Sequence, residues 1–391
     1  MAARATAARV GLSLALLLYA ALVVGSGFDR LSANAPAMER LVPRPFRAQA
    51  ARSAAELASV RGQRGAMLAN ARQAVAADPV DPGSASLLGA ALLLQGDNRG
   101  AERAFRVAAR FGWRDVATQV YWFEAAVESN EMEPAADRLD ALLRAQPDFP
   151  QSEALLARLE TTGAGRAALE RRLAARPGWL STYVQISGLA PAAVPRRAGV
   201  LVELGRGGTR LGCAGVAPFV TGALDAGARR EAEQVWLAHC PGARIDRGIA
   251  DPGFEAFGTE QASPFGWQAA PSGDVSIEPV AVARGNRALR LRNGAPVTRL
   301  MLVQPVALPP GRYRLTAKVV PGRLAASIGC KGSPAMPQDV RGDPGQGGEM
   351  LELPDCERPA LGLWLRPGAN ETELDDVALV PLAQSPASAR E

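Results

Sequence analysis

The residues able to do chemistry in this chain are few, and histidine is the scarcest of them. Its 391 residues include one histidine, His239, which stands directly before Cys240. A Ser-His-Asp or Cys-His catalytic arrangement would need this imidazole, because histidine is the usual base that activates such nucleophiles. The alternative is a structural histidine at the end of a helical stretch. We favour it, because we expect Cys240 to be held in a disulfide.

Other catalytic signatures are also missing from the sequence. No zinc-ligand cluster, G-x-S-x-G motif or Walker motif occurs. Two glycine-rich runs, residues 205–208 and 342–348, do not join a strand to a helix as phosphate-binding loops do. A carboxylate pair for glycoside hydrolysis leaves no signature in one sequence, so that alternative stays open. We nevertheless predict a protein that is not an enzyme and has no catalytic residue.

Four cysteines form two pairs by their place in the chain. Cys213 and Cys240 fall in the helical part, Cys330 and Cys356 fall in the strand-rich part, and neither pair has C-x-x-C spacing. An exported protein would form a disulfide within each pair. Each bond should then stabilise the fold by roughly 3–4 kcal/mol in the chain-entropy model. The alternative is four buried free thiols.

The N-terminus has the features of an export segment. Arg4 and Arg9 precede an uncharged stretch over residues 10–24, which the small residues 25–27 extend as far as Phe28. The shorter stretch suits a signal peptide, whereas the extended one just reaches the length of a bilayer span. The small residues 25–27 would suit cleavage, but we favour an uncleaved single-pass anchor in the bacterial inner membrane, with the remainder in the periplasm. The alternative is a cleaved, periplasmic protein.

A 34-residue repeat becomes visible when the helical segments after the anchor are aligned. Large and small apolar residues recur at matching offsets, namely Met67, Ala71 and Ala74, then Leu88, Gly89, Leu92, Ala101, Phe105 and Ala108, then Trp122, Phe123, Ala126, Ala135 and Leu139. Small residues let two helices cross closely, and a large residue follows one turn later. This pattern resembles the tetratricopeptide family over about residues 55–180. The resemblance implies an α-solenoid whose concave face binds a partner protein.

Later helical segments keep this character only in part. They are expected near residues 180–190, 195–205, 212–224 and 227–239, with a shortened register. From about residue 245 glycine and proline become dense, and apolar residues alternate with polar ones. The alternating runs are residues 288–292, 313–319, 361–365 and 377–379. Short alternating strands with Gly/Pro turns predict an antiparallel β-sandwich.

Motifs within this second part occur in an order that resembles the carbohydrate-binding modules, which are galactose-binding-like jelly rolls. They are residues 251–255 (Asp-Pro-Gly-Phe-Glu), 264–267, 285–291, 304–306, 310–315 and 374–377, within a region covering about 248–382. The resemblance implies a polysaccharide ligand and a structural calcium held by Glu255 and Asp375, with Asp376 beside them. The alternative is that these acids only cap strands.

Sugar binding usually needs exposed aromatic rings, and two tryptophans are candidates for that role. Trp364 alternates with leucines in its strand, so it faces outward if the leucines face the core. Trp267 follows Phe265 and Gly266, and its alternative role is a buried structural anchor. Tyr313 shares the apolar face of its strand, so we expect it in the core.

The predicted organisation is therefore an α region followed by a β region. Its parts are a membrane helix (1–28), a linker (29–52), a tetratricopeptide-like array (53–243), a β-sandwich (245–383) and a disordered tail (384–391). The net charge is +5 and the pI about 9.4, but the arginines are scattered among acidic residues, so we expect no nucleic-acid partner.

The expected function follows from this organisation and from the two resemblances. The layout resembles tetratricopeptide proteins of alphaproteobacterial, sphingomonad-type envelopes. We expect a scaffold that binds another envelope protein through its helices and a polysaccharide through its sandwich, in exopolysaccharide assembly or export. The alternative is a purely protein–protein adaptor whose sandwich is structural and binds no sugar. No cofactor is expected apart from the calcium.

Overall fold

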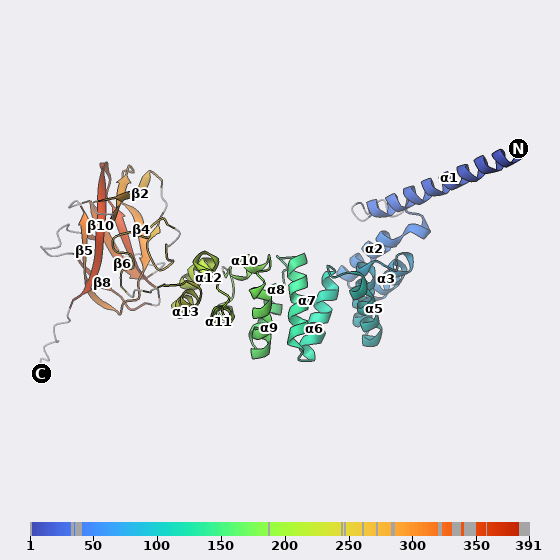
Figure 1. Ribbon diagram of the computed structural model, residues 1–391, viewed down its shortest axis with the longest axis horizontal. Helices are drawn as coiled ribbons and strands as arrows, with labels where there is room; N and C mark the ends of the chain where they lie inside the picture. The colour runs from blue at the N-terminus through green and yellow to red at the C-terminus, as the bar shows by residue number, and fades with distance from the viewer. Residues whose placement is uncertain are drawn as a thin grey trace. The chain divides into compact units, whose positions relative to one another are not determined.

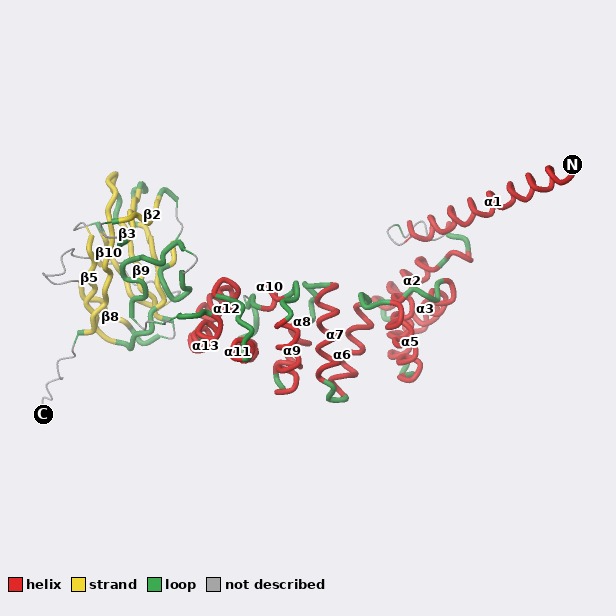
Figure 2. Tube along the Cα trace, in the orientation of Figure 1, coloured by secondary structure: helices red, strands yellow, loops and turns green. Residues whose placement is uncertain are grey.

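The computed structural model describes residues 2–32, 35, 41–186, 188–243, 245, 248–259, 262–270, 273–282, 286–319, 323–330, 338–339, 349–356 and 358–382. Two compact units divide the chain: unit 1 is Met1–Trp179 and unit 2 is Leu180–Glu391. Figure 1 shows the helices and the strands, and Figure 2 marks the change from helix to strand along the chain. The tail predicted over residues 384–391 lies outside the described residues, and the predicted domain boundaries stay predictions.

Unit 1 begins with the long helix α1, Ala2–Ser32. Among the described residues, Gly11–Ser32 is the one helical segment long and apolar enough to cross a membrane, a test that a signal sequence also passes. The end of α1 approaches the short 3-10 helix η2, Arg44–Phe46, very closely. A Cβ atom at Gly25 would lie 2.6 Å from the ring of Phe46. Glycine at this position therefore allows the two segments to touch.

Asp29 joins α1 to the first helix of the array, α2, Ala48–Val60. Its buried carboxylate accepts hydrogen bonds from the backbone N–H groups of Gln49 (2.9 Å) and Ala50 (3.0 Å). These are among the donors that a helix N-terminus leaves unsatisfied, and the N-cap residue Arg47 makes no side-chain bond to them. The last residues of α1 are thus part of the packing of unit 1.

Four helix pairs make up the rest of unit 1. They are α2 with α3 (Arg64–Ala77), α4 (Pro82–Leu94) with α5 (Asn98–Phe111), α6 (Val116–Glu128) with α7 (Met132–Ala145), and α8 (Ser152–Glu160) with α9 (Gly163–Ala174). The starts of α2, α4 and α6 are 34 residues apart, which is the tetratricopeptide spacing. The helical array predicted from the repeat is therefore confirmed.

The repeated apolar positions form the interfaces between these helices. Ala71, Phe105 and Leu139 occupy equivalent places in α3, α5 and α7, and each is at most 2% exposed. Opposite Phe105, a Cβ atom on Gly89 would come within 2.7 Å of the phenyl ring. The small residue at 89 therefore makes room for the large one at 105, as the repeat pattern predicts.

Unit 2 opens with four helices: α10 (Leu180–Tyr183), α11 (Ala193–Arg206), α12 (Cys213–Asp225) and α13 (Arg229–His239). Three of them match the predicted segments to within a few residues. The prediction of a helix over 180–190 is wrong, because α10 ends at Tyr183. Gly188 adopts a left-handed φ of 84°, and Pro191 disfavours helical geometry in the residue before it.

The rest of unit 2 is a sandwich of two antiparallel sheets, as predicted. The strands are β1 (Gln268–Ala269), β2 (Val275–Ala281), β3 (Arg287–Asn293), β4 (Arg299–Pro305), β5 (Gly311–Val319), β6 (Leu324–Cys330), β7 (Gln338–Asp339), β8 (Glu349–Leu353), β9 (Pro359–Leu365) and β10 (Gly368–Pro381). One sheet has the order β1-β4-β9-β6-β7 and the other β2-β3-β10-β5-β8. Leucines of both sheets meet in one core, which also contains Tyr313.

Candidate functional site

A groove of about 1070 Å³ lies in the described part of unit 1. Its walls come mainly from α2, α4 and α6, which are the first helices of three successive pairs. The second helices of the pairs contribute only Asn98 and Phe105. First helices of stacked pairs form the concave face of such arrays, so the groove runs along the inner surface of the array.

The groove repeats its lining with the period of the array. Arg52, Ser86 and Val120 stand at equivalent positions of α2, α4 and α6, and all three line the groove. A second set, one helical turn further along, consists of Glu56, Ala90 and Glu124. Because every first helix presents the same face, successive repeats extend one continuous surface.

Aspartates fix the start of two of these first helices. Asp81 accepts hydrogen bonds from the N–H groups of Gly83 (3.3 Å) and Ser84 (2.8 Å), and Arg52 pairs with it at 3.5 Å. Burial raises the pKa of the Asp81 carboxyl, but the bonds from Ser84 and Gly83 and the charge of Arg52 outweigh burial and lower it. Asp81 therefore stays ionised and holds both its helix and a groove residue in place.

Asp115 has the same role one repeat later, at the start of α6. It accepts a hydrogen bond from the N–H group of Thr118 at 2.9 Å, and Ser86 donates to it from α4 at 3.1 Å. This bond ties neighbouring first helices together across the groove wall. The sequence carried a signal for both caps, because Asp81 and Asp115 are 34 residues apart and each directly precedes a helix.

The aromatic rings of Phe105 and Tyr121 line part of the groove. Tyr121 stacks on Phe105 with centroids 4.1 Å apart and an interplanar angle of 10°, and its other neighbour is Trp122, edge-on at 5.1 Å. Burial, together with the negative charges of Glu102 and Glu128, raises the pKa of the Tyr121 hydroxyl. Tyr121 therefore remains a neutral hydrogen-bond donor within an apolar surface.

The charged residues of the groove are mostly acidic. Glu56, Asp115, Glu124 and Glu128 line it, against two arginines. Ion pairs partly balance these charges: Arg52 holds Glu56 at 3.1 Å, and Arg158 of α8 holds Glu124 at 3.0 Å. The apolar part of the lining includes Leu87, Ala90, Leu93, Val120 and Phe149.

The two tryptophans predicted to contact sugar have different surroundings. Trp267 is 6% exposed, lies against Phe254 with ring centroids 5.5 Å apart, and donates its indole N–H to the carbonyl of Asp251 at 3.0 Å. It belongs to the sandwich core and presents no exposed ring face. Its indole anchors the 251–255 loop, which is the structural alternative given above.

Trp364 lies on the opposite side of its strand from the buried leucines. Leu363 and Leu365 are 0% exposed, whereas Trp364 is half-buried. The indole ring therefore lies on the outer face of the strand, as the alternation predicts. The indole N–H is engaged, because it donates to the Ser327 hydroxyl of β6 at 2.8 Å. A sugar would find part of the ring face but not the N–H group.

The residues predicted to hold calcium do not form a donor cluster. Asp375 accepts hydrogen bonds from the side chain of Asn286 (3.2 Å) and the N–H of Asp376 (2.8 Å). Across the described residues, no group of three or more His, Cys, Asp or Glu side chains lies close enough to hold a metal ion. Calcium also accepts backbone and amide oxygens as ligands, so the calcium site stays a prediction that depends on the resemblance alone.

The two acidic motifs meet each other through the backbone instead. The N–H of Val377 donates to the carbonyl of Pro252 at 3.0 Å, at a register shift where Asp376 adopts a left-handed φ of 48°. Such a bulge lets a strand redirect one backbone group. Ala250, which directly precedes the 251–255 motif, is held by the buried side chain of Gln304. The N–H of Ala250 donates to the Gln304 amide oxygen (2.9 Å), and the Gln304 amide nitrogen donates to the carbonyl of Ala250 (2.7 Å). The motifs thus have a structural use without a metal.

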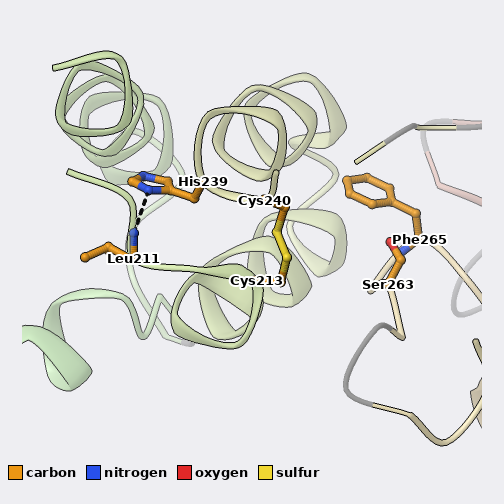
Figure 3. The surroundings of a disulfide bond; sticks show 6 residues. All are labelled: Leu211, Cys213, His239, Cys240, Ser263 and Phe265. Atoms are coloured by element: carbon orange, nitrogen blue, oxygen red, sulfur yellow. Dashed lines mark hydrogen bonds between the residues drawn. A yellow bond between two sulfur atoms is a disulfide. The ribbon is translucent and has the colours of Figure 1, made fainter. Parts of the chain in front are cut away.

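Both predicted disulfides are present, Cys213–Cys240 and Cys330–Cys356. Figure 3 shows the first of them with His239 beside it, pointing toward Leu211. The N–H of Leu211 donates to Nδ1 of His239 at 3.2 Å, so Nε2 carries the proton and donates to the carbonyl of Leu201 at 2.8 Å. Backbone groups occupy both ring nitrogens, and these contacts link α11 and α13 to the segment that precedes α12.

Comparisons with known proteins add little to these observations. No family model and no curated protein matches the chain. One similar solved structure is described as "Functional Characterization of Pseudomonas Aeruginosa pilF"; it is 14% identical, with a TM-score of 0.30, over 50% of this chain and 90% of that one. With a TM-score this low, the class of the protein, a tetratricopeptide-like helical array with a C-terminal β-sandwich, is defined by its own helix spacing and sheets.

Proposed function

We propose that this protein is a non-catalytic, membrane-anchored adaptor that binds an extended segment of another envelope protein in the groove of unit 1. The observation that carries the proposal is the repeated lining of α2, α4 and α6, which offers one continuous surface to a linear ligand. A chain segment suits such a surface better than a compact small molecule does, because its contacts recur along its length.

The chemistry of the groove indicates what kind of segment it binds. Part of the lining is apolar and includes Leu87 and Val120, while acidic side chains outnumber basic ones in it. Complementary charge steers association and fixes register. The expected partner segment is therefore extended, carries apolar side chains and is flanked by lysine or arginine.

The anchor and the compartment complete the proposal. Helix α1 would hold unit 1 at the inner membrane, and the two disulfides are consistent with an oxidising compartment such as the periplasm. No enzymatic role enters the proposal, since both nitrogens of the single histidine bind backbone groups. No nucleic-acid role enters it either, since the arginines are scattered among acidic residues.

A photo-crosslinking experiment in intact cells tests the groove. A benzophenone amino acid replaces Leu87 or Ala90 in the groove, and, as a control, Val107 on α5, which is apolar and 40% exposed but does not line the groove. The expected result is one and the same partner segment crosslinked from both groove positions and not from position 107.

A charge change then identifies the contribution of the acidic residues. Replacing both Glu56 and Glu124 by lysine should weaken the crosslink to the partner segment about tenfold, because the segment's basic flanks would then meet like charge. Equal crosslinking from Leu87 and Val107, or a double variant that crosslinks as before, would contradict the proposal.

The intact mass of the same membrane protein reports whether α1 is retained.

Polysaccharide binding by the sandwich, in exopolysaccharide assembly or export, is a second and narrower proposal. It depends on Trp364, the half-buried ring on the outer side of β9. We expect the full-length protein to be retarded in an affinity gel containing an acidic or neutral polysaccharide, and Trp364→Ala to lose that retardation. A Trp113→Ala variant, which removes a 60% exposed tryptophan of unit 1, is the matched control. If no glycan changes the migration of the protein, sugar binding is contradicted and the purely protein–protein adaptor is the function supported.

A further inference from the structure

Unit 2 has a pocket of its own, between its last two helices and one sheet of the sandwich. The pocket measures about 230 Å³ and is formed by α12, the start of α13, and strands β1, β4 and β9. This volume is below the roughly 300–1,000 Å³ of most small-molecule sites, so a compact ligand would fill it. Apolar side chains such as Leu224, Val303 and Val306 make up much of its wall.

Arg229, at the start of α13, is the first of two arginines in this wall. Its Nε donates to Glu233 at 2.8 Å, and its guanidinium lies 5.3 Å from the centroid of the Phe265 ring. Its Nη2 atom is buried and has no hydrogen-bond partner. Because Arg229 lines the pocket, its guanidinium group places a positive charge in the pocket wall.

Arg358, just before β9, is the second arginine. Its Nη1 donates to the backbone carbonyl of Asp225 at 2.7 Å, which fixes the side chain across the turn between α12 and α13. Asp225 also lines the pocket, so two positive groups stand against one negative group there. The described lining therefore combines apolar side chains with a net positive charge.

We infer that this pocket binds a small carboxylate with a compact apolar body. Arginine binds planar carboxylates through its N–H groups, and both Arg229 and Arg358 line the pocket. A hydroxylated sugar acid fits less well, because Thr221 and Gln268 are the only neutral polar side chains among the described residues that line the pocket. The site is independent of the groove in unit 1.

Ligand-observed saturation-transfer NMR on the full-length protein in detergent tests the inference, with benzoate as the probe. Benzamide has the same shape without the charge, and we expect it to bind about tenfold more weakly. Arg229→Gln and Arg358→Gln should each weaken benzoate binding about tenfold as well. Arg230→Gln, which alters an exposed neighbour outside the pocket, should leave binding unchanged.

A filled pocket separates loss of the site from loss of the fold. Ala269 lies on β1 and is exposed, so Ala269→Phe should occupy the pocket while the thermal unfolding temperature stays near that of the parent. Abolished benzoate binding in this variant supports the inference. Benzamide binding as tightly as benzoate, or retained binding in Ala269→Phe, would overturn it. Glucuronate binding as tightly as benzoate would overturn the requirement for an apolar body.

Discussion

Mild acid is expected to destabilise unit 2 through one side chain, His239. Burial and, further, the charge of Arg210 lower the pKa of this imidazole, against the opposing effect of its bond to the Leu201 carbonyl. The unfolded chain, with a histidine pKa near 6.5, then binds the proton more readily than the folded protein. The contribution of neutral His239 to the free energy of unfolding is therefore fully present above pH about 6.5. It falls by up to about 1.4 kcal/mol per pH unit as the pH drops toward the pKa of His239 in the folded protein.

Chemical denaturation of unit 2, followed at several pH values between about 7.5 and 5.5, measures this effect in the range above the carboxylate pKa values. The variant His239→Gln is the control, because His239 is the only histidine. It should be about 1–3 kcal/mol less stable at neutral pH and should lose most of the slope. An unchanged slope in the variant would show that another group controls the acid response.

Replacing Phe105 by alanine should give the largest loss of stability in unit 1, about 3–5 kcal/mol. The ring is 2% exposed, fills the space left by Gly89 and supports Tyr121 by stacking. Its removal leaves a cavity at the crossing of α4 and α5 and frees the tyrosine that lines the groove. Thermal unfolding measures the stability, and the Leu87 crosslink measures the groove.

Phe111→Ala is the matched control on the same helix. Phe111 is 51% exposed, so its truncation should change stability by no more than about 0.5 kcal/mol and leave the crosslink intact. Similar losses from the two substitutions would mean that Phe105 is not central to the packing of the array.

The sequence predicted the array well because close helix crossings restrict residue size. The crossing of α4 and α5 needs a small residue at Gly89 opposite the large residue at Phe105. The same need recurs in each repeat, so the residue sizes repeat along the chain with a period that a single sequence reveals. The groove was harder to foresee. Its lining residues, such as Glu56 and Glu124, are solvent-facing within their own helices, and only the stacking of successive helices makes them one surface.

The sandwich shows where alternation fails as a signal. Strand β6, Leu324–Cys330, is buried along nearly its whole length, so its sequence does not alternate and the strand was missed. Strand β1 has two residues, too few for a period. The change of composition near residue 245 marks where helix gives way to strand, but it does not report packing between elements. The contact of Trp236 with Phe265, 6.3 Å between ring centroids, joins α13 to the sandwich beyond that point.

The joint between α1 and α2 has a mechanical consequence. Asp29 is hydrogen-bonded to the first turn of α2, and Phe46 lies against Gly25, so the last part of α1 packs directly on the start of the array. Transmembrane helices tilt when the hydrocarbon thickness around them changes. With α1 in a bilayer, a change in its tilt would rotate the repeats that pack on it. Lipid composition, through the thickness of the membrane, would then set the angle at which a partner meets the groove.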